Sequence, residues 1–320
     1  IAADEIETFT SRWSGTGHYG IVSKGVGMRV SDPGTFSLSI PGSVVHATLY
    51  WEGFDEVPGG DDTVSLTVDS QPKTSLKADE TIGPKYWRAN ENIYLYVKNV
   101  TDVLQDLSPG QHTLSITDFA MGIEKLGGGI IVVYQDNNLP ESLVEIRDGL
   151  DRFYCGWDAE RGESVAHTFV LNQASTSRNV TFTIIATEMN DGFEAGPNDT
   201  LFRPNALWYK SSTGTIPTNI INTDGAQRID YANDVDDYTD YPFRSSDGSQ
   251  WDTYFSQDAR VSPILIPAGA TYLAVQIESV EGVGEYNCAS GIMNAMGIVI
   301  PTGKTGNGES STFTVTKQVS

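Results

Sequence analysis

The chain has 320 residues, a formal net charge of −22 and a sequence pI of about 4.3. Hydrophobic residues make up 39% and charged residues 19%, so the chain can bury apolar cores and wholesale disorder is excluded. The length favours two domains. The acidic charge repels nucleic-acid phosphates and anionic membranes, which excludes nucleic acid as a partner; it suits divalent cations or a solvated surface.

The first half of the chain contains short segments in which apolar and polar residues alternate, as in strands with one buried face. Turn-forming Pro, Gly and Asp residues separate them. The expected strands are residues 43–54, 63–68, 92–97, 112–116 and 130–134. A single helical turn is expected at residues 100–107, with Thr101 as its cap.

The second half repeats this pattern of short strands and turns. Its expected strands are residues 165–171, 180–186, 206–209, 253–255, 272–277 and 296–300. Residues 107–119 and 266–279 correspond, as do residues 127–135 and 295–302. The chain is therefore predicted to be all-β, with two tandem jelly-roll-like β-sandwich domains that arose by internal duplication. The alternative is two unrelated sandwiches that share turn chemistry.

The expected domains are residues 1–142 and 143–309, followed by a tethered terminal strand at residues 310–320. Around the boundary, Leu143, Val144 and Ile146 indicate a strand that runs directly into the second domain. A rigid pair is expected, because little of this region resembles a flexible linker.

An extracellular location is expected from the start of the chain, and this location favours a disulfide between its two cysteines. The chain begins IAADEIETF, with no initiator Met and no signal-peptide pattern, as a secreted protein does after signal removal; a recombinant fragment would begin in the same way. No run of about 18 apolar residues is present, so no membrane span is predicted. Cys155 and Cys288 are expected to form one long-range disulfide, worth about 4–5 kcal/mol in the chain-entropy model; two buried free thiols are the alternative.

Acidic loops are the richest chemical feature of the sequence. Closely spaced Asp and Asn side chains can supply several of the six to eight oxygens that Ca²⁺ requires. Residues 234–240, which hold four of these aspartates, lack the layout of an EF-hand. A solvated acidic loop is the alternative. The candidate calcium ligands are Asp191, Asp199, Asp234, Asp236, Asp237, Asp240, Asp247 and Asp252.

No catalytic motif is present: the four histidines are isolated, and nucleophile-elbow, phosphate-loop and dinucleotide-binding patterns are missing. Glu52, Glu188 and Glu278 adjoin expected strands and are the candidates for a glycosidase pair. Asn99, Asn179 and Asn198 head glycosylation sequons. Trp87, Trp157, Trp208 and Trp251 are either sugar-binding platforms or packing residues.

The last eleven residues, SSTFTVTKQVS, alternate Phe313, Val315 and Val319 with polar residues and follow a Gly-rich run. A tethered strand of this kind can add to an open sheet edge of a neighbouring subunit. Such head-to-tail contacts do not close, so they build filaments. Residues 6–13 are a second candidate. The alternatives are that either strand completes its own domain, or that the tail begins a further domain.

The segments GGGIIVVYQDNNLPES (127–142) and EIRDGLDRFY (145–154) resemble a family of uncharacterised secreted β-sandwich domains from cell-surface proteins of methanogenic archaea and bacteria. Members commonly contain the pattern VVVYED..LP...I...DG. TVTKQVS (314–320) resembles the start of the repeats that follow such domains. The resemblance implies location and architecture, and it implies no activity.

The sequence therefore favours a non-enzymatic structural subunit of an extracellular filament, sheath or surface matrix. Its expected partner is itself, through β-strand addition strengthened by Ca²⁺, with glycans as further ligands. A surface adhesin or carbohydrate-binding module is the alternative, and a glycoside hydrolase is the third.

Overall fold

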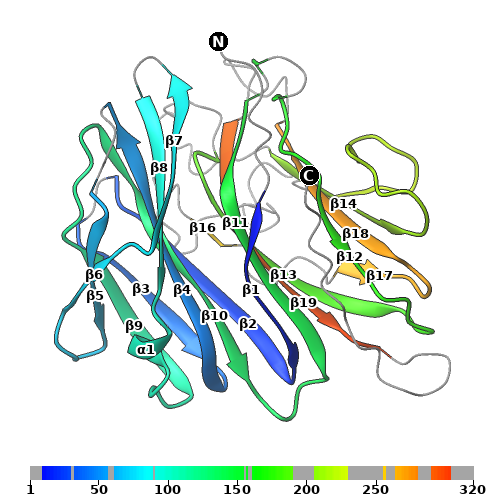
Figure 1. Ribbon diagram of the computed structural model, residues 1–320, viewed down its shortest axis with the longest axis horizontal. Helices are drawn as coiled ribbons and strands as arrows, with labels where there is room; N and C mark the ends of the chain where they lie inside the picture. Colours follow the sequence, from blue (N-terminus) through cyan, green and yellow to red (C-terminus); the bar gives the residue numbers. More distant parts are fainter. Residues whose placement is uncertain are drawn as a thin grey trace, which may run out of the picture.

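The computed structural model describes residues 9–29, 32–56, 61–88, 91–154, 156–157, 161–189, 205–229, 255–256, 264–279 and 290–303. These residues form four antiparallel sheets that stack in the order outer, inner, inner, outer (Figure 1). The prediction of an all-β chain of sandwiches is confirmed, while the internal duplication stays a prediction.

Two sheets make up the sandwich on the left of Figure 1. The outer N-terminal sheet has the order β3 (Gly34–Ile40), β9 (Gly110–Thr117), β5 (Thr63–Val68) and β6 (Thr74–Lys77). The inner N-terminal sheet has the order β2 (Tyr19–Gly27), β10 (Glu124–Gln135), β4 (Ser43–Asp55), β8 (Glu91–Asn99) and β7 (Glu80–Arg88).

The other two sheets make up the sandwich on the right. The inner C-terminal sheet has the order β1 (Thr10–Gly17), β11 (Ser142–Tyr154), β19 (Ser290–Pro301), β13 (Arg178–Thr187) and β16 (Phe255–Ser256), and β17 (Ile264–Ile266) also pairs with β13. The outer C-terminal sheet has the order β12 (His167–Val170), β18 (Tyr272–Glu278), β14 (Ala206–Ser212) and β15 (Gln227–Ile229).

Both inner sheets are buried on both faces. In β10, Ile130 and Val132 point into the core of the first sandwich, whereas Ile131 and Val133 point into a second core between the two inner sheets. Successive side chains of a strand face opposite ways, so a strand buried on both faces reads as a continuous apolar run. This double burial explains the IIVV segment and joins the sandwiches through packed side chains instead of a linker.

The first strand crosses from one sandwich to the other. β1 pairs antiparallel with β11, from Thr10 opposite Asp148 to Gly17 opposite Ser142, and the chain then enters β2 of the inner N-terminal sheet. The sheet of the second sandwich thus includes a strand from the start of the chain. The boundaries at residues 142 and 309 stay a prediction.

Several expected elements are confirmed and one is corrected. β5 spans the expected residues 63–68, and β11 begins at Ser142 and continues past the expected boundary. The helix α1 is shorter than expected, Thr101–Leu104, with Val100 at the N-cap position and no side-chain cap. The capping prediction for Thr101 is wrong because its Oγ1 instead accepts a hydrogen bond from Ala47 N at 3.0 Å. No helix within the described residues is long and apolar enough to cross a membrane.

We expect Ile131→Ala to destabilise the whole protein by about 2–5 kcal/mol, because it opens a cavity in the core between the inner sheets. Urea unfolding followed by tryptophan fluorescence and circular dichroism should still show one transition. Leu265→Ala, at a residue that is 53% exposed, is the control and should change stability by at most about 0.5 kcal/mol. Two separated transitions for Ile131→Ala would contradict the joint packing of the sandwiches.

Candidate functional site

Most of the site residues expected from the sequence lie outside the described residues. These are the eight aspartate calcium candidates (Asp191 to Asp252), Cys155 and Cys288, the sequon residue Asn198, and Phe313, Val315 and Val319 of the terminal strand. In the part of the chain that the structure describes, no group of three or more His, Cys, Asp and Glu side chains could hold a metal ion. The calcium, disulfide and strand-addition predictions therefore stay predictions.

The other expected residues can be placed. Asn99 and Asn179 are exposed, so both sequons are accessible, and glycosylation stays a prediction. Trp87 and Trp208 are each only 7% exposed. Trp87 stacks on Phe54 in the core between the inner sheets, and Trp208 donates a hydrogen bond to Glu278 at 2.7 Å. These two tryptophans are packing residues and do not form an exposed sugar platform.

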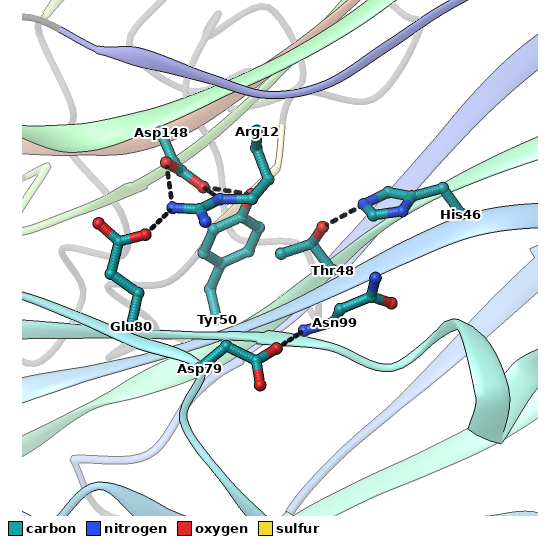
Figure 2. Close-up of polar contacts among 8 residues, drawn as sticks. All are labelled: Arg12, His46, Thr48, Tyr50, Asp79, Glu80, Asn99 and Asp148. Atoms are coloured by element: carbon teal, nitrogen blue, oxygen red, sulfur yellow. Dashed lines mark hydrogen bonds and ion pairs between the residues drawn. The ribbon is translucent and has the colours of Figure 1, made fainter.

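A polar cluster around Arg12 lies where β1 meets both inner sheets (Figure 2). Arg12 Nε donates to Asp148 Oδ2 at 2.7 Å, and its Nη2 donates to Glu80 Oε2 at 2.7 Å. Tyr50 Oη donates to the same Asp148 oxygen at 3.1 Å. The Asp148 side chain is 0% exposed. The cluster therefore ties β1 to β11, β4 and β7, with one member from each strand.

The charges of this cluster follow from its burial. Burial raises the pKa of Asp148, and the hydrogen bond and ion pair with Arg12 oppose that shift. The same hydrogen bond raises the pKa of Arg12, so the guanidinium stays charged. Nearby, burial and then the charge of Arg12 lower the pKa of His46 to about 4, so His46 is neutral at pH 7. Its Nε2 lies 2.8 Å from Thr48 Oγ1 (Figure 2).

A second polar cluster, the Glu52 triad (Glu52, Thr187 and Asn294), bridges the two sandwiches. Thr187 Oγ1 and Asn294 Nδ2 each donate to Glu52 Oε2 at 2.7 Å. All three residues are 0% exposed. Glu52 belongs to β4 of the inner N-terminal sheet, whereas the other two belong to β13 and β19 of the inner C-terminal sheet.

Local strand geometry explains how the triad is assembled. Glu52 lies between Tyr50 and Phe54 on the face of β4 that packs in the core between the inner sheets. Asn294 occupies a β-bulge: the ladder with β13 passes from Ala295 opposite Ile185 to Met293 opposite Ala186 and leaves Asn294 unpaired. The ladder with β11 shifts register at the same place. Bulges re-aim side chains, and this one places a carboxamide opposite Glu52.

Glu52 has a strongly perturbed acidity. Burial raises its pKa to about 8, the hydrogen bonds from Thr187 and Asn294 lower it, and the charge of Glu188 raises it. Glu188 adopts a left-handed backbone conformation with φ of 53° and forms an ion pair with Arg29. Arg29 also pairs with Glu124 at 2.7 Å, and both line an open surface cleft of about 400 Å³. A line of polar groups thus runs from the cleft to the buried triad.

The structure brings two of the three expected glycosidase carboxylates near each other and keeps the third away. Glu278 pairs with Arg228 at 3.1 Å in the outer C-terminal sheet. Glu52 has no exposed surface, and the Glu188 side chain is 8% exposed and paired with Arg29. A sugar therefore has no access to Glu52 in this arrangement.

The sequence reasoning missed Arg12, Tyr50, Asp148, Thr187 and Asn294. One signal was present: Glu52 and Asn294 interrupt apolar runs of strands, and a charged or amide side chain inside such a run requires a partner. The partners themselves come from strands that are distant in sequence. The signal therefore identifies Glu52 and Asn294 as unusual positions, but it does not predict that they meet.

No family model and no curated protein sequence matches the chain. Among solved structures, the VP2 subviral particle of infectious bursal disease virus is similar at 11% identity, over 94% of this chain and 74% of that chain, with a TM-score of 0.28. The major capsid protein P2 of bacteriophage PM2 is 10% identical, over 88% and 97%, with a TM-score of 0.22. A protein from Eubacterium rectale is 8% identical, over 87% of this chain and 74% of that chain, with a TM-score of 0.18. Similarities at these scores carry no argument about function.

The raised pKa of Glu52 makes a pH-dependent prediction. The folded state keeps the proton up to about pH 8, whereas the ordinary value of 4.5 applies after unfolding, so stability falls as pH rises between these values. Between pH 4.5 and 8, the free energy of unfolding of the wild-type protein should fall by up to about 5 kcal/mol more than that of Glu52→Gln. Urea unfolding across this range is the measurement. Glu56→Gln, at an exposed residue, is the control and should follow the wild type. If the unfolding free energies of the wild type and Glu52→Gln change in parallel with pH, the raised pKa of Glu52 is refuted.

Proposed function

We propose that this chain is a non-enzymatic structural subunit of an extracellular filament, sheath or surface matrix, and that it carries tension along its strands. The observation that supports the load-bearing role is the way in which the chain enters and leaves the inner C-terminal sheet. It enters on β1 and leaves on β19, and both strands flank β11.

The strand registers give the direction of each strand. Asp148 of β11 lies opposite Thr10 on one side and Ala295 on the other. Ser142, at the other end of β11, lies opposite Gly17 and Pro301. β1 and β19 therefore run in the same direction (Figure 1), so Thr10 and Pro301 lie at opposite ends of the ladder between β1 and β11.

A pull on the two ends of the chain acts along these strands. Hydrogen bonds between antiparallel strands are perpendicular to the strands, so such a force shears every bond of a ladder together instead of opening them one at a time. The partly buried ion pair between Arg12 and Asp148 resists the same displacement of β1 against β11. Sliding of β11 or β19 would also expose residues of the core between the inner sheets.

Assembly by strand addition belongs to the same proposal. The tail with Phe313, Val315 and Val319 would add to a sheet edge of a neighbouring subunit. Subunits that each carry a formal charge of −22 repel one another, and Ca²⁺ would reduce this repulsion. The second candidate, residues 6–13, is corrected: residues from Thr10 onward already pair with β11 of their own chain.

Single-molecule pulling tests the load-bearing role. Pulling between the two ends of the chain should give a first unfolding force at least about twofold higher than pulling between the N-terminus and residue 86, because the second geometry peels β1 from its Thr10 end. Tyr86 is 50% exposed and contacts Arg152 near that end, so an azidophenylalanine there can carry the handle. Equal forces in the two geometries would contradict the shear arrangement.

Negative-stain microscopy tests the assembly. The purified chain should form linear polymers with Ca²⁺, and these should be lost on deletion of residues 310–320 and weakened by EDTA. The triple change Phe313→Ser, Val315→Ser and Val319→Ser is the matched variant, since it keeps the length of the tail but removes its apolar side chains. Single particles under all conditions, with and without the tail, would refute the proposed assembly.

A further inference from the structure

We infer that Thr187 and Asn294 become joined by an internal ester bond, with Glu52 as the group that moves the proton. The bond would covalently link β13 to β19 inside the core between the inner sheets. This inference does not depend on the assembly proposed above.

The triad contains the three groups that such a reaction needs. Thr187 supplies a hydroxyl as nucleophile, Asn294 supplies a carboxamide as acceptor, and Glu52 supplies a carboxyl group that contacts both and is partly ionised at pH 8. Thr187 Oγ1 lies 3.5 Å from Asn294 Nδ2, the nitrogen of the leaving group. Holding the hydroxyl and the carboxamide beside one carboxyl group raises their effective concentration.

A single oxygen of Glu52 serves both ends of the proton transfer. Oε2 is 2.7 Å from the hydroxyl of Thr187 and 2.7 Å from the amide nitrogen of Asn294. A group that takes a proton from the nucleophile and returns it to the leaving group must reach both, and this oxygen does. The raised pKa of Glu52 also makes its carboxylate a stronger base than an ordinary one.

The step balances without any further reactant. Thr187 Oγ1 attacks the carboxamide carbon of Asn294 while its proton passes to Glu52. The C–N bond then breaks, and Glu52 returns the proton to the departing nitrogen, which leaves as ammonia. The product is the Thr187–Asn294 ester and a regenerated Glu52 carboxylate, and nothing is oxidised or reduced.

The surroundings favour formation of the bond and its persistence. Among the described residues, Asn294 Oδ1 and Glu52 Oε1 are buried without a hydrogen-bond partner. Ile185, Ile292 and Ala295 belong to the apolar core on the same strands, and they exclude the water that would hydrolyse an ester. The reaction occurs once in the lifetime of a molecule, so slow chemistry is sufficient.

The bond would also strengthen the path of tension. β19 pairs with β11 on one side and with β13 on the other. A covalent link at Asn294 would prevent β19 from sliding past β13, so only the residues between Asn294 and the end of β19 could be pulled out.

Intact-mass measurement of the reduced protein tests the inference. After incubation at pH 8, the wild-type chain should be lighter than its sequence by one molecule of ammonia. Tandem mass spectrometry of a tryptic digest should find the peptides that contain Thr187 and Asn294 joined. Mild alkali should separate them and leave Asp at position 294.

Matched variants distinguish this bond from other losses of ammonia. Thr187→Val and Glu52→Gln should abolish the loss, whereas Thr187→Ser should retain it. Thr183→Val is the control: Thr183 is 4% exposed on the same face of β13, and this variant should still lose ammonia. The inference is overturned if folded wild-type protein keeps its full mass, or if Thr187→Val still loses ammonia, because attack by the backbone would then be the cause.

Discussion

The apolar contact between the two inner sheets is the constraint on which the rest of the molecule depends. It buries Tyr50, Ile131, Val144 and Val299, from four different strands, on the second face of sheets that already enclose a core on the first. Each large apolar side chain buried in this way contributes about 1.5–3 kcal/mol. Neither inner sheet can be exposed to water on this face without losing that contribution, so the two sandwiches form one body.

The same contact governs the polar chemistry. Asp148 and Glu52 lie among apolar neighbours, where an unpaired charge is expensive, and each is held by side chains from other strands. Asp148 has a guanidinium as partner and remains an ion pair, whereas the described partners of Glu52 are a hydroxyl and an amide, and its pKa rises to about 8. The difference between a structural ion pair and a reactive triad thus follows from the partners, because the burial of the two carboxyl groups is similar.

The sequence predicted several strands in which one face is polar. Alternation marked β5 and most of β4 and β9, and Leu143, Val144 and Ile146 correctly indicated a strand across the expected boundary. It did not mark β3, although Phe36, Leu38 and Ile40 alternate there with polar residues. It also did not mark β2, β6 or β7, in which polar residues or glycine break the pattern. The stacking of the four sheets could not be predicted from the sequence either. An IIVV run has the same composition whether it packs inside one sandwich or between two sandwiches.

The candidate sites also differ in how far the sequence predicts them. Acidic loops are conspicuous in the sequence, yet their aspartates fall outside the described residues, while the Glu52 triad depends on a bulge at Asn294 and on pairing between strands over a hundred residues apart in sequence. Registers and bulges of this kind arise from tertiary packing, and local composition does not encode them.

Native-state hydrogen exchange at increasing urea concentration tests the unity of the two sandwiches most directly. If the contact between the inner sheets joins them, the slowest amides of β4 and β10 and those of β11 and β19 should exchange with one common opening free energy and one urea dependence. A lower opening free energy for either inner sheet alone would show that one sandwich opens while the other stays folded, and would contradict a single body built on that contact.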